Sequence, residues 1–334
     1  MPKVELHVHL EGSIQPETLL KLAERNQVTL PATTVEGLRH WYTFTNFAHF
    51  IEIYLTISSC ICSAEDIELI AREFLRGQAA QNIQHSEVTF TPYTHFSLNR
   101  KIPFEDQLAA LSRARAWAAE EFGISVSWVL DISRNVRPIE HGLTVADWVI
   151  SGKDQGVIAL GLGGPESGNP PELFAEAFDR VLAAGLASVP HAGEVAGAES
   201  VRGALRTLKA QRIGHGVRCL EDPELVAELR QRQIPLEVCP TSNVCLGVAA
   251  SIAEHPLPRL LEAGLYVTIN SDDPPMFNTT LTDEYLKIAD AFHFSQETIE
   301  QLVFNAVRAS LLPELTRTTL EEKFRSEFSA LRGD

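Results

Sequence analysis

The stretch PKVELHVHLEGS, residues 2–13, contains a β-type run in which two histidines, His7 and His9, stand two positions apart. On a β-strand, residues two apart point to the same face, so the two imidazoles project together. If that face is the interior of a barrel, both rings converge near its C-terminal mouth, where barrel enzymes keep their active sites. The stretch therefore predicts a first strand that delivers two candidate ligands to one point.

Similar runs recur along the chain and alternate with segments of helical periodicity such as DIELIAREFLRGQAA, residues 66–80. The eight expected strands span residues 4–10, 83–90, 124–132, 157–162, 187–191, 212–215, 234–239 and 266–270. Strands that alternate with helices form parallel sheets from βαβ units, and eight such units predict a closed (β/α)8 TIM barrel of the α/β class. Neither a GxGxxG fingerprint nor a GxxxxGK[ST] phosphate loop occurs.

No linker or repeat divides the chain, so we expect a single (β/α)8 domain over residues 1–334. The unusually long connection between the first two strands contains WYTFTNFAHFIEIYL, residues 41–55, which is rich in aromatic side chains. This connection predicts a helical insertion at about 35–80. The insertion either forms a hydrophobic lid over a pocket or packs as an ordinary helix pair against the barrel.

Composition limits the classes of function. The chain has 334 residues, of which 45% are hydrophobic and 22% charged, and its net charge is -16. This charge opposes binding to nucleic-acid backbones or anionic membranes. No signal peptide and no apolar run of about 18 residues occurs, and the five cysteines form no disulfide framework, so we expect a cytoplasmic protein. The sequence gives no indication of oligomeric state, and we assign Cys60 and Cys62 to packing.

Polar residues end several of the other expected strands. The fifth ends in HAGE, with His191 and Glu194; the sixth ends in RIGHG, with His215; the eighth ends in NSDDP, with Asp272 and Asp273. Each motif alone fits a core histidine, a helix cap or a turn, but together they indicate a catalytic metal site with an open position. We predict these ligands for one zinc ion per chain, or for ferrous iron: His7, His9, His191 and Asp272.

Three ionisable residues, Glu194, His215 and Asp273, then remain beside the metal without a coordination role. Zinc makes hydroxide available at neutral pH, an imidazole can orient the water, and carboxyl groups can deliver a proton and fix the substrate. Such a set suits addition of water to a C=N or C=O centre. The strand-four end, LGGPE, lacks the lysine that bridges two metals in related barrel hydrolases, which favours a single metal.

The motifs PKVELHVHLEGS, GLGGPE, HAGE, RIGHG, EVCPTSN and NSDDP together resemble the adenosine/adenine deaminase family of the amidohydrolase superfamily, in the family's order and over nearly the whole chain. The resemblance implies a hydrolytic purine aminohydrolase that converts a 6-amino group to 6-oxo and releases ammonia. It implies that Glu194 protonates N1, His215 orients the hydroxide, Asp273 contacts N7 and the Gly164 N–H meets N3. His9 and Glu11 then also lie beside the substrate.

The resemblance also bears on the substrate. Adenosine-specific relatives carry an aspartate that contacts the 5′-hydroxyl where this chain has Glu11, and the loop GLGGPE leaves room where adenine deaminases read GLDSSE. We therefore predict adenosine or a 5′-modified adenosine such as 6-aminodeoxyfutalosine, with free adenine as the alternative. AMP is disfavoured because no Arg/Lys cluster adjoins the motifs. Two further alternatives are another amidohydrolase reaction and a barrel that binds a ligand without catalysis.

Overall fold

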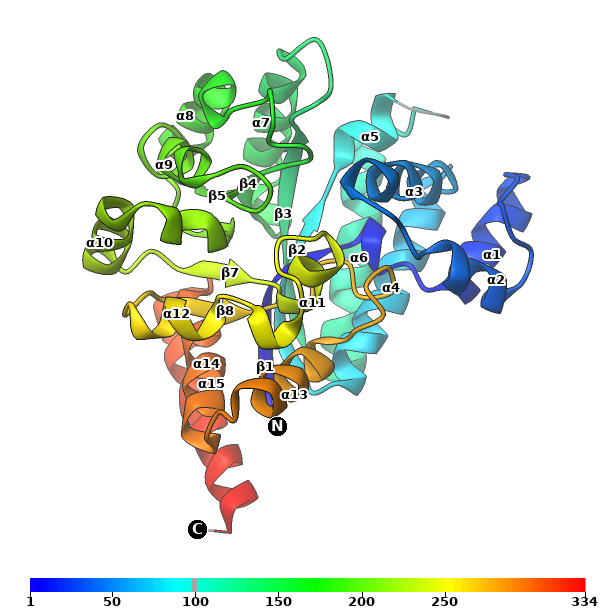
Figure 1. The fold of residues 1–334 in the computed structure, drawn as a ribbon. Helices are drawn as coiled ribbons and strands as arrows, with labels where there is room; N and C mark the ends of the chain where they lie inside the picture. Colours follow the sequence, from blue (N-terminus) through cyan, green and yellow to red (C-terminus); the bar gives the residue numbers. More distant parts are fainter. Residues whose placement is uncertain (98–100, 334) are drawn as a thin grey trace.

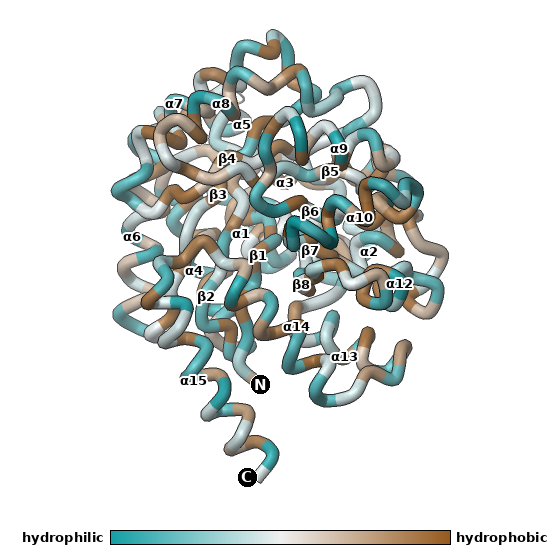
Figure 2. Tube along the Cα trace, turned by 90° about the vertical axis from the view of Figure 1, so that its left-hand side faces the viewer, coloured by the Kyte–Doolittle hydropathy of each residue, from teal (hydrophilic) through white to brown (hydrophobic). Residues whose placement is uncertain are grey.

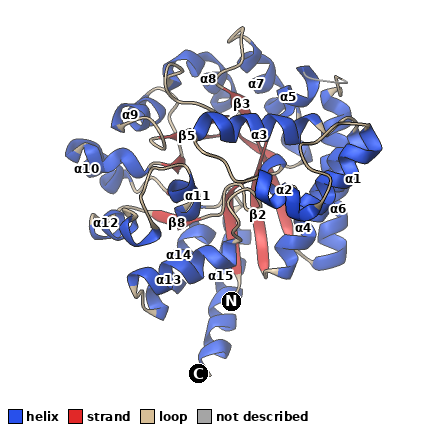
Figure 3. Cartoon of the chain, turned by 45° about the vertical axis from the view of Figure 1, so that its right-hand side comes forward, coloured by secondary structure: helices blue, strands red, loops and turns tan. Residues whose placement is uncertain are grey.

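The computed structural model describes residues 1–97 and 101–333, and it contains one eight-stranded parallel sheet in the order β1 to β8. The strands run over β1 Lys3–His9, β2 Ile83–Phe90, β3 Ser125–Ser133, β4 Val157–Gly163, β5 Ala187–Ala192, β6 Ile213–His215, β7 Leu236–Val238 and β8 Val267–Ile269. The strands lie at the centre of the molecule with the helices around them (Figures 1 and 3). The prediction of a (β/α)8 TIM barrel is therefore confirmed.

Helices follow most strands, as the βαβ pattern requires. The α-helices are α1 Pro16–Asn26, α2 Val35–Trp41, α3 Phe47–Ser59, α4 Ala64–Ala80, α5 Pro92–Ser97, α6 Phe104–Phe122, α7 His141–Ser151, α8 Ala175–Ala183, α9 Ala198–Arg206, α10 Pro223–Arg232, α11 Pro240–Cys245, α12 Leu257–Glu262, α13 Leu281–Phe292, α14 Gln296–Ala309 and α15 Glu314–Arg332. Their beginnings follow the sequence: Asn46 caps α3, and Ser63 and Asp66 form a capping box on α4.

The barrel closes between β1 and β8, next to the predicted metal ligands. The His9 N–H donates to the Asp272 carbonyl at 2.9 Å, and the Asp272 N–H donates to the His7 carbonyl at 3.1 Å. Further down, the Asn270 side-chain oxygen accepts hydrogen bonds from two β1 amides, those of Leu6 and His7. The same contacts between β1 and the end of β8 therefore close the barrel and bring His7 and His9 next to Asp272.

Buried apolar side chains from the strands and the surrounding helices form the hydrophobic core. Figure 2 marks the hydrophobic residues along the chain in brown. The largest cluster joins strand residues such as Val88 and Leu130 to helix residues such as Leu75 and Leu111, all of which are buried. Burial of this much apolar surface supplies the main driving force for folding. The C-terminal helix α15 extends from the body in both views (Figures 1 and 2).

The connection between β1 and β2 contains α1 to α4. Helix α4 packs mainly against α6 on the outside of the barrel, whereas α3 lies across the ends of the strands (Figure 3). Among the described residues no single helix has the length and apolar composition to cross a membrane. Only α3 and α4 together, bent by 117° at their break, pass that test. The single domain over 1–334 and the cytoplasmic location stay predictions.

Candidate metal centre and active site

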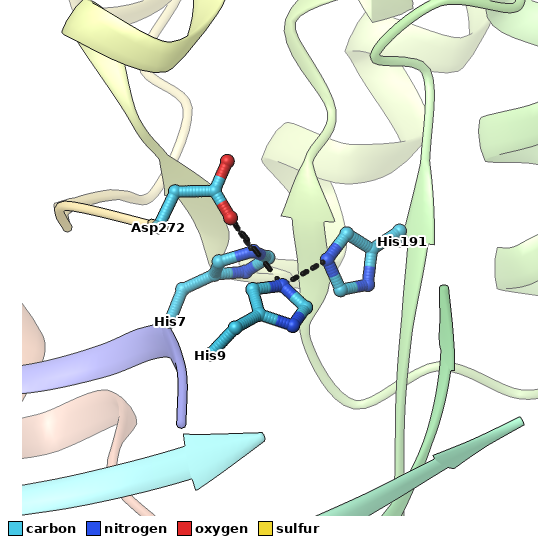
Figure 4. A group of neighbouring side chains, drawn as sticks. All are labelled: His7, His9, His191 and Asp272. Carbon is cyan, nitrogen blue, oxygen red and sulfur yellow. Dashed lines mark hydrogen bonds and ion pairs between the residues drawn. The ribbon is translucent and has the colours of Figure 1, made fainter. Parts of the chain in front are cut away.

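The four predicted metal ligands meet at the barrel mouth, although they come from three separate parts of the sequence. One potential ligand atom from each of His7, His9, His191 and Asp272 lies within 4.8 Å of the others. The Nε2 atoms of His9 and His191 are 3.1 Å apart, and Asp272 Oδ1 is 3.3 Å from His9 Nε2 and 3.4 Å from His7 Nε2. Figure 4 shows the three rings and the carboxylate pointing toward one another.

This arrangement fits a cation. The Nδ1 of His7 faces Glu237 Oε2 at 2.9 Å, so a proton on Nδ1 leaves the lone pair of Nε2 directed at the cluster. That Nε2 is buried and has no hydrogen-bond partner among the described residues. A buried nitrogen without a partner is costly unless an ion or a ligand occupies its lone pair. Imidazole and carboxylate are donors that suit zinc and ferrous iron.

The electrostatics of the cluster agree with a positive charge at its centre. Burial alone lowers the pKa of His7, but the neighbouring carboxylates of Asp272 and Glu237 raise it to about 9. Burial and the charges of His7 and His9 hold the pKa of His191 well below its usual value. Burial would raise the pKa of Asp272, but its close contacts with His7 and His9 hold it well below its usual range. The carboxylates thus favour a positive charge at His7, and a cation bound there would take the place of the proton, because neutral imidazole and ionised carboxylate are the forms that bind metals.

A second group at the same position, His215, Cys239 and Asp272, also has ligand atoms within 4.8 Å of one another. Burial and the nearby carboxylate of Asp272 raise the pKa of the Cys239 thiol well above its usual value. A neutral thiol is a poor ligand because the thiolate is the form that binds metal. The three-histidine group is therefore the better candidate.

Two of the predicted site residues at this rim have strained backbone conformations. His215 and Asp272 adopt left-handed conformations, with φ of 60° and 67°. Non-glycine residues in this region carry a conformational cost, and they cluster at functional sites where the surrounding structure holds them. Each stands just at or beyond the end of its strand, β6 or β8, so the strained turn directs the side chain toward the cluster.

The three predicted residues without a ligand role lie beside the cluster. His215 Nε2 is 3.5 Å from Glu194 Oε1 and 3.9 Å from Asp272 Oδ2. Burial lowers the pKa of His215 to about 4, so its ring is neutral at pH 7. Burial and the charge of Asp272 raise the pKa values of Glu194 and Asp273 well above their usual range. The site therefore combines a neutral imidazole with two carboxyl groups whose environment favours the protonated form.

A further carboxylate, Glu166, holds the HAGE turn in place. Its two oxygens accept hydrogen bonds from four consecutive backbone N–H groups, at Gly193, Glu194, Val195 and Ala196, at 2.8 to 3.2 Å. The Ser200 hydroxyl donates to the same carboxylate. Four amides on one ionised acceptor fix the turn, and with it the direction of the Glu194 side chain.

A cavity of about 350 Å³ opens beside the cluster, in the size range of ligand pockets. Helix α3 contributes Phe47, Phe50, Ile51, Tyr54 and Leu55 to its wall. The predicted contacts His9, Gly164, Glu194, His215 and Asp273 also line it.

Glu11 is the exception among the predicted substrate contacts, because it is fully buried and does not line this cavity. Its Oε1 accepts from the Thr91 N–H at 3.0 Å and lies 2.9 Å from His95 Nε2, and its Oε2 accepts from the Tyr54 hydroxyl at 3.3 Å.

The sequence analysis missed one side of the cavity. Beyond the cluster, β3 and the loop after it contribute Asp131, Ser133, Asn135 and Arg137 to the wall, at intervals of two residues. Burial raises the pKa of Asp131 to about 6, so it is ionised at neutral pH. Asp131 stands near the end of the third expected strand, so the rule that pointed to the other strand ends also applied to it. No sequence signal indicated the direction of the loop side chains.

Comparison with known sequences gives one consistent result. The sequence model of a family described as "Adenosine deaminase" matches residues 2–326. The chain is 42% identical over 318 residues to an aminodeoxyfutalosine deaminase of Streptomyces avermitilis, covering 93% of this chain and 87% of that protein. It is 40% identical over 325 residues to an adenine deaminase of Trichlorobacter lovleyi, covering 94% of this chain and 92% of that protein.

Solved structures agree with the sequence relatives. An adenine deaminase from Arthrobacter aurescens superposes with a TM-score of 0.93 at 34% identity, covering 98% of this chain and 99% of that one. An amidohydrolase from Burkhoderia ambifaria, solved with bound Zn, superposes with a TM-score of 0.92 at 26% identity, covering 100% of this chain and 92% of that one.

Proposed function

Because the chain belongs to the adenosine deaminase family and is a hydrolytic deaminase of adenine-type purines, we propose that its substrate is an adenine nucleoside substituted at the 5′ position, with 6-aminodeoxyfutalosine as the leading candidate. Free adenine is the second candidate, since relatives of nearly equal identity are named adenine deaminase. The names therefore do not decide between the two substrates. The choice rests on the cavity.

The cavity supports a nucleoside because its wall continues beyond the cluster of proposed metal ligands. Its inner end includes His191 and Asp272, and its wall continues past Asp131 along the β3 loop to Arg137. A free purine base needs only the inner end, next to the groups that act on C6. The remaining wall is polar on the β3 side and apolar on the α3 side, which suits a ribose and a substituent beyond it.

Arg137 also bears on the kind of substituent. Among the described residues that line the cavity, it is the only lysine or arginine. It is exposed, and its Nη1 is held by the Arg134 and Val136 carbonyls at 2.8 and 2.9 Å. A single guanidinium at the mouth suits one carboxylate better than a phosphate that needs several cations.

We assign the metal to His7, His9, His191 and Asp272, as zinc or ferrous iron, one per chain. When bound there, such an ion supplies a coordinated water with a pKa near neutrality. His215, neutral at pH 7, accepts a proton from the attacking water, and the oxygen forms its bond to C6. Glu194, whose raised pKa favours the protonated form, gives its proton to N1, so that the C6–N1 double bond becomes single.

The later steps use the same groups. Asp273, whose raised pKa also favours the protonated form, donates a hydrogen bond to N7, and the Gly164 N–H donates to N3. Together these contacts hold the ring with C6 toward the cluster. His215 then gives the proton it took from water to N6, the C6–N6 bond breaks, and ammonia leaves. The new C6 hydroxyl loses its proton to the Glu194 carboxylate, which restores the acid and completes the 6-oxo product.

We further propose that α3 is the lid of this site within a single barrel domain. Five of its residues line the cavity, and its Phe50 stacks on Phe277, 5.6 Å between ring centroids, on the loop after β8. The helix thus connects the cavity wall to the strand end that carries Asp272 and Asp273.

A substrate panel tests the proposal. The metal-replete protein is incubated with adenine, adenosine, 5′-deoxyadenosine, methylthioadenosine, 6-aminodeoxyfutalosine and AMP, and ammonia release is followed with the fall in adenine absorbance. We expect kcat/KM to be highest for a 5′-substituted nucleoside, by about 10-fold or more over free adenine. A higher kcat/KM for adenine than for every nucleoside would contradict the nucleoside assignment and leave the deaminase assignment intact.

A further inference from the structure

We propose that Asp131 determines sugar specificity by accepting a hydrogen bond from a ribose hydroxyl of the substrate. The inference rests on the proposed function, because it requires that the substrate carries a sugar. It replaces the role that the family resemblance implied for Glu11.

The position of Asp131 fits such a contact. It lies near the C-terminal end of β3, with only 3% of its surface exposed, and it lines the same cavity as His9 and Asp273. The neighbouring strand β4 has a glycine beside its carboxylate. A Cβ at Gly163 would lie 2.5 Å from Asp131 Oδ2, so a side chain at that position would displace the carboxylate.

The bonding of Asp131 is incomplete. Its Oδ1 is buried and has no hydrogen-bond partner among the described residues. Burying an unpaired carboxylate oxygen costs more free energy than burying an unpaired neutral acceptor, because a charged group loses more favourable hydration. The side chain borders a cavity, so a ligand can supply the missing donor.

The chemistry of the substrate identifies that donor. N1, N3 and N7 of an adenine ring are acceptors, and in the proposed mechanism they meet Glu194, Gly164 and Asp273. The 6-amino group lies at the catalytic cluster. The donors that remain on a nucleoside are its sugar hydroxyls, whereas free adenine would offer its N9–H instead. A carboxylate that only accepts is matched to either, and the two cases can be separated by experiment.

Glu11 is less suited to this contact. Both of its oxygens already have partners in the protein, His95 and the Thr91 N–H on Oε1 and the Tyr54 hydroxyl on Oε2. It lies outside the cavity lining, whereas Tyr54, which contacts it, is part of that lining. Asp131 contacts Thr91, but its Oδ1 has no partner among the described residues, and its side chain lines the cavity.

The test compares Asp131→Ala with the unchanged protein on adenosine, 2′-deoxyadenosine, 3′-deoxyadenosine and adenine. We expect the substitution to lower kcat/KM for adenosine by about 10- to 100-fold, mainly through KM, because a hydrogen bond to a charged group is lost. We expect kcat/KM for adenine to change by less than about 3-fold. One deoxynucleoside should be a poor substrate of the unchanged protein, and this penalty should vanish in Asp131→Ala.

Each other outcome overturns the inference. A parallel fall for adenosine and adenine would assign Asp131 a structural role, and a fall for adenine alone would assign it to N9–H. A deoxy penalty that persists in Asp131→Ala would place the sugar contact elsewhere. If the unchanged protein deaminates adenine but no nucleoside, the proposed function fails instead.

Two further variants keep the test interpretable. Asp131→Asn keeps the size of the side chain and should show the same selective effect if Asp131→Ala folds poorly. Glu52→Gln changes an exposed carboxylate on α3 outside the cavity and should leave every kcat/KM unchanged. Thermal unfolding and metal content of each variant should match those of the unchanged protein. Binding of inosine and of hypoxanthine, measured by calorimetry, gives a readout without turnover: Asp131→Ala should weaken only inosine.

Discussion

Asp272 and Asp273 are adjacent in the sequence, yet their environments shift their pKa values in opposite directions. The close contacts of Asp272 with His7 and His9 overcome the effect of burial and hold its pKa well below the usual range. Asp273 is buried without such a partner and lies beside the charge of Asp272, so its pKa is raised well above its usual range. One aspartate is thereby suited to hold a cation and the other to donate a hydrogen bond.

Substitution Glu194→Gln tests the assignment of the proton donor. The amide keeps the shape of the side chain but cannot deliver a proton to the ring, so we expect kcat/KM to fall by about 10²- to 10⁴-fold. Metal content, measured by elemental analysis, should not change, because Glu194 is not among the four proposed ligands. Activity within a few-fold of the unchanged protein would exclude Glu194 as the donor.

Gly12 allows a second test at single-residue scale. A Cβ at this position would lie 1.5 Å from Asp273 Oδ1, so Gly12→Ala must displace the Asp273 carboxyl. A displacement of about 1 Å in a positioning group can lower the rate about 100-fold, and we expect a loss of kcat/KM of that order. Gly77→Ala is the matched control, since a Cβ there meets nothing within 4 Å. Equal activity of the two variants would show that catalysis does not depend on the position of the Asp273 carboxyl group.

Much of the residue-level geometry follows from one rule about parallel barrels. The carboxyl ends of the strands meet at one rim, so His9, His191, His215 and Asp272 could be expected to gather from sequence alone. The path of a loop side chain follows no such rule. The direction of Arg137 depends on the Arg134 and Val136 carbonyls that hold its guanidinium, and no local pattern encodes these contacts.

At the scale of elements, the eight expected strands are all present. The observed strand lengths depart most from the expected ones in the second half of the barrel. Residues 234–239 were expected to form one strand, but β7 comprises only Leu236–Val238. Pro235 has no N–H to donate to the ladder, and Cys239 already turns into α11. The hydrophobic periodicity of the sequence identifies such strands. Their ends depend on hydrogen bonds to neighbouring strands, which are distant in the sequence.

Helix α3 is the element whose function is most open to test. Leu55 lines the cavity and is 42% exposed, so it contributes little to the core. If α3 is a lid over the substrate, Leu55→Ser should raise KM for the 5′-substituted nucleoside about 3- to 10-fold through lost apolar contact, with an unchanged melting temperature. Thr56→Ser, one position along and outside the lining, should have no effect on KM. An unaltered KM in Leu55→Ser would favour the alternative of an ordinary packed helix.

At the scale of the whole molecule, a buried charge network connects the metal centre to the middle of the barrel. Arg212 lies 2.6 Å from Glu87 Oε2 on β2 and 2.5 Å from Glu237 Oε1 on β7, and Glu237 in turn contacts His7 on β1. The Arg212 side chain also donates to the Ala309 carbonyl at the end of α14. The Arg212 guanidinium, just before β6, therefore joins two strands and one helix, and Glu237 extends the network to β1.

This network predicts how stability depends on pH. Burial alone would raise the pKa values of Glu87 and Glu237, but the Arg212 charge holds both below the ordinary value of 4.5. A carboxylate whose folded pKa is lowered stabilises the fold above its unfolded pKa and loses that contribution as pH falls through the folded value. We therefore expect the free energy of unfolding to decline below about pH 4.5, as measured by urea unfolding at a series of pH values.

Arg212→Met should reverse the sign of that dependence. Without the guanidinium, two buried carboxylates lose their partner, and we expect a loss of about 3–5 kcal/mol at pH 7. Burial then raises both pKa values above 4.5, so protonation favours the folded state and the variant should gain stability as pH falls from 7 toward 5. Arg206→Met removes an exposed arginine that pairs with Glu228 at 2.7 Å, and it should leave the free energy of unfolding almost unchanged at every pH. If both variants unfold alike at every pH, the network does not hold the barrel together, and the orientation of His7 must depend on other contacts.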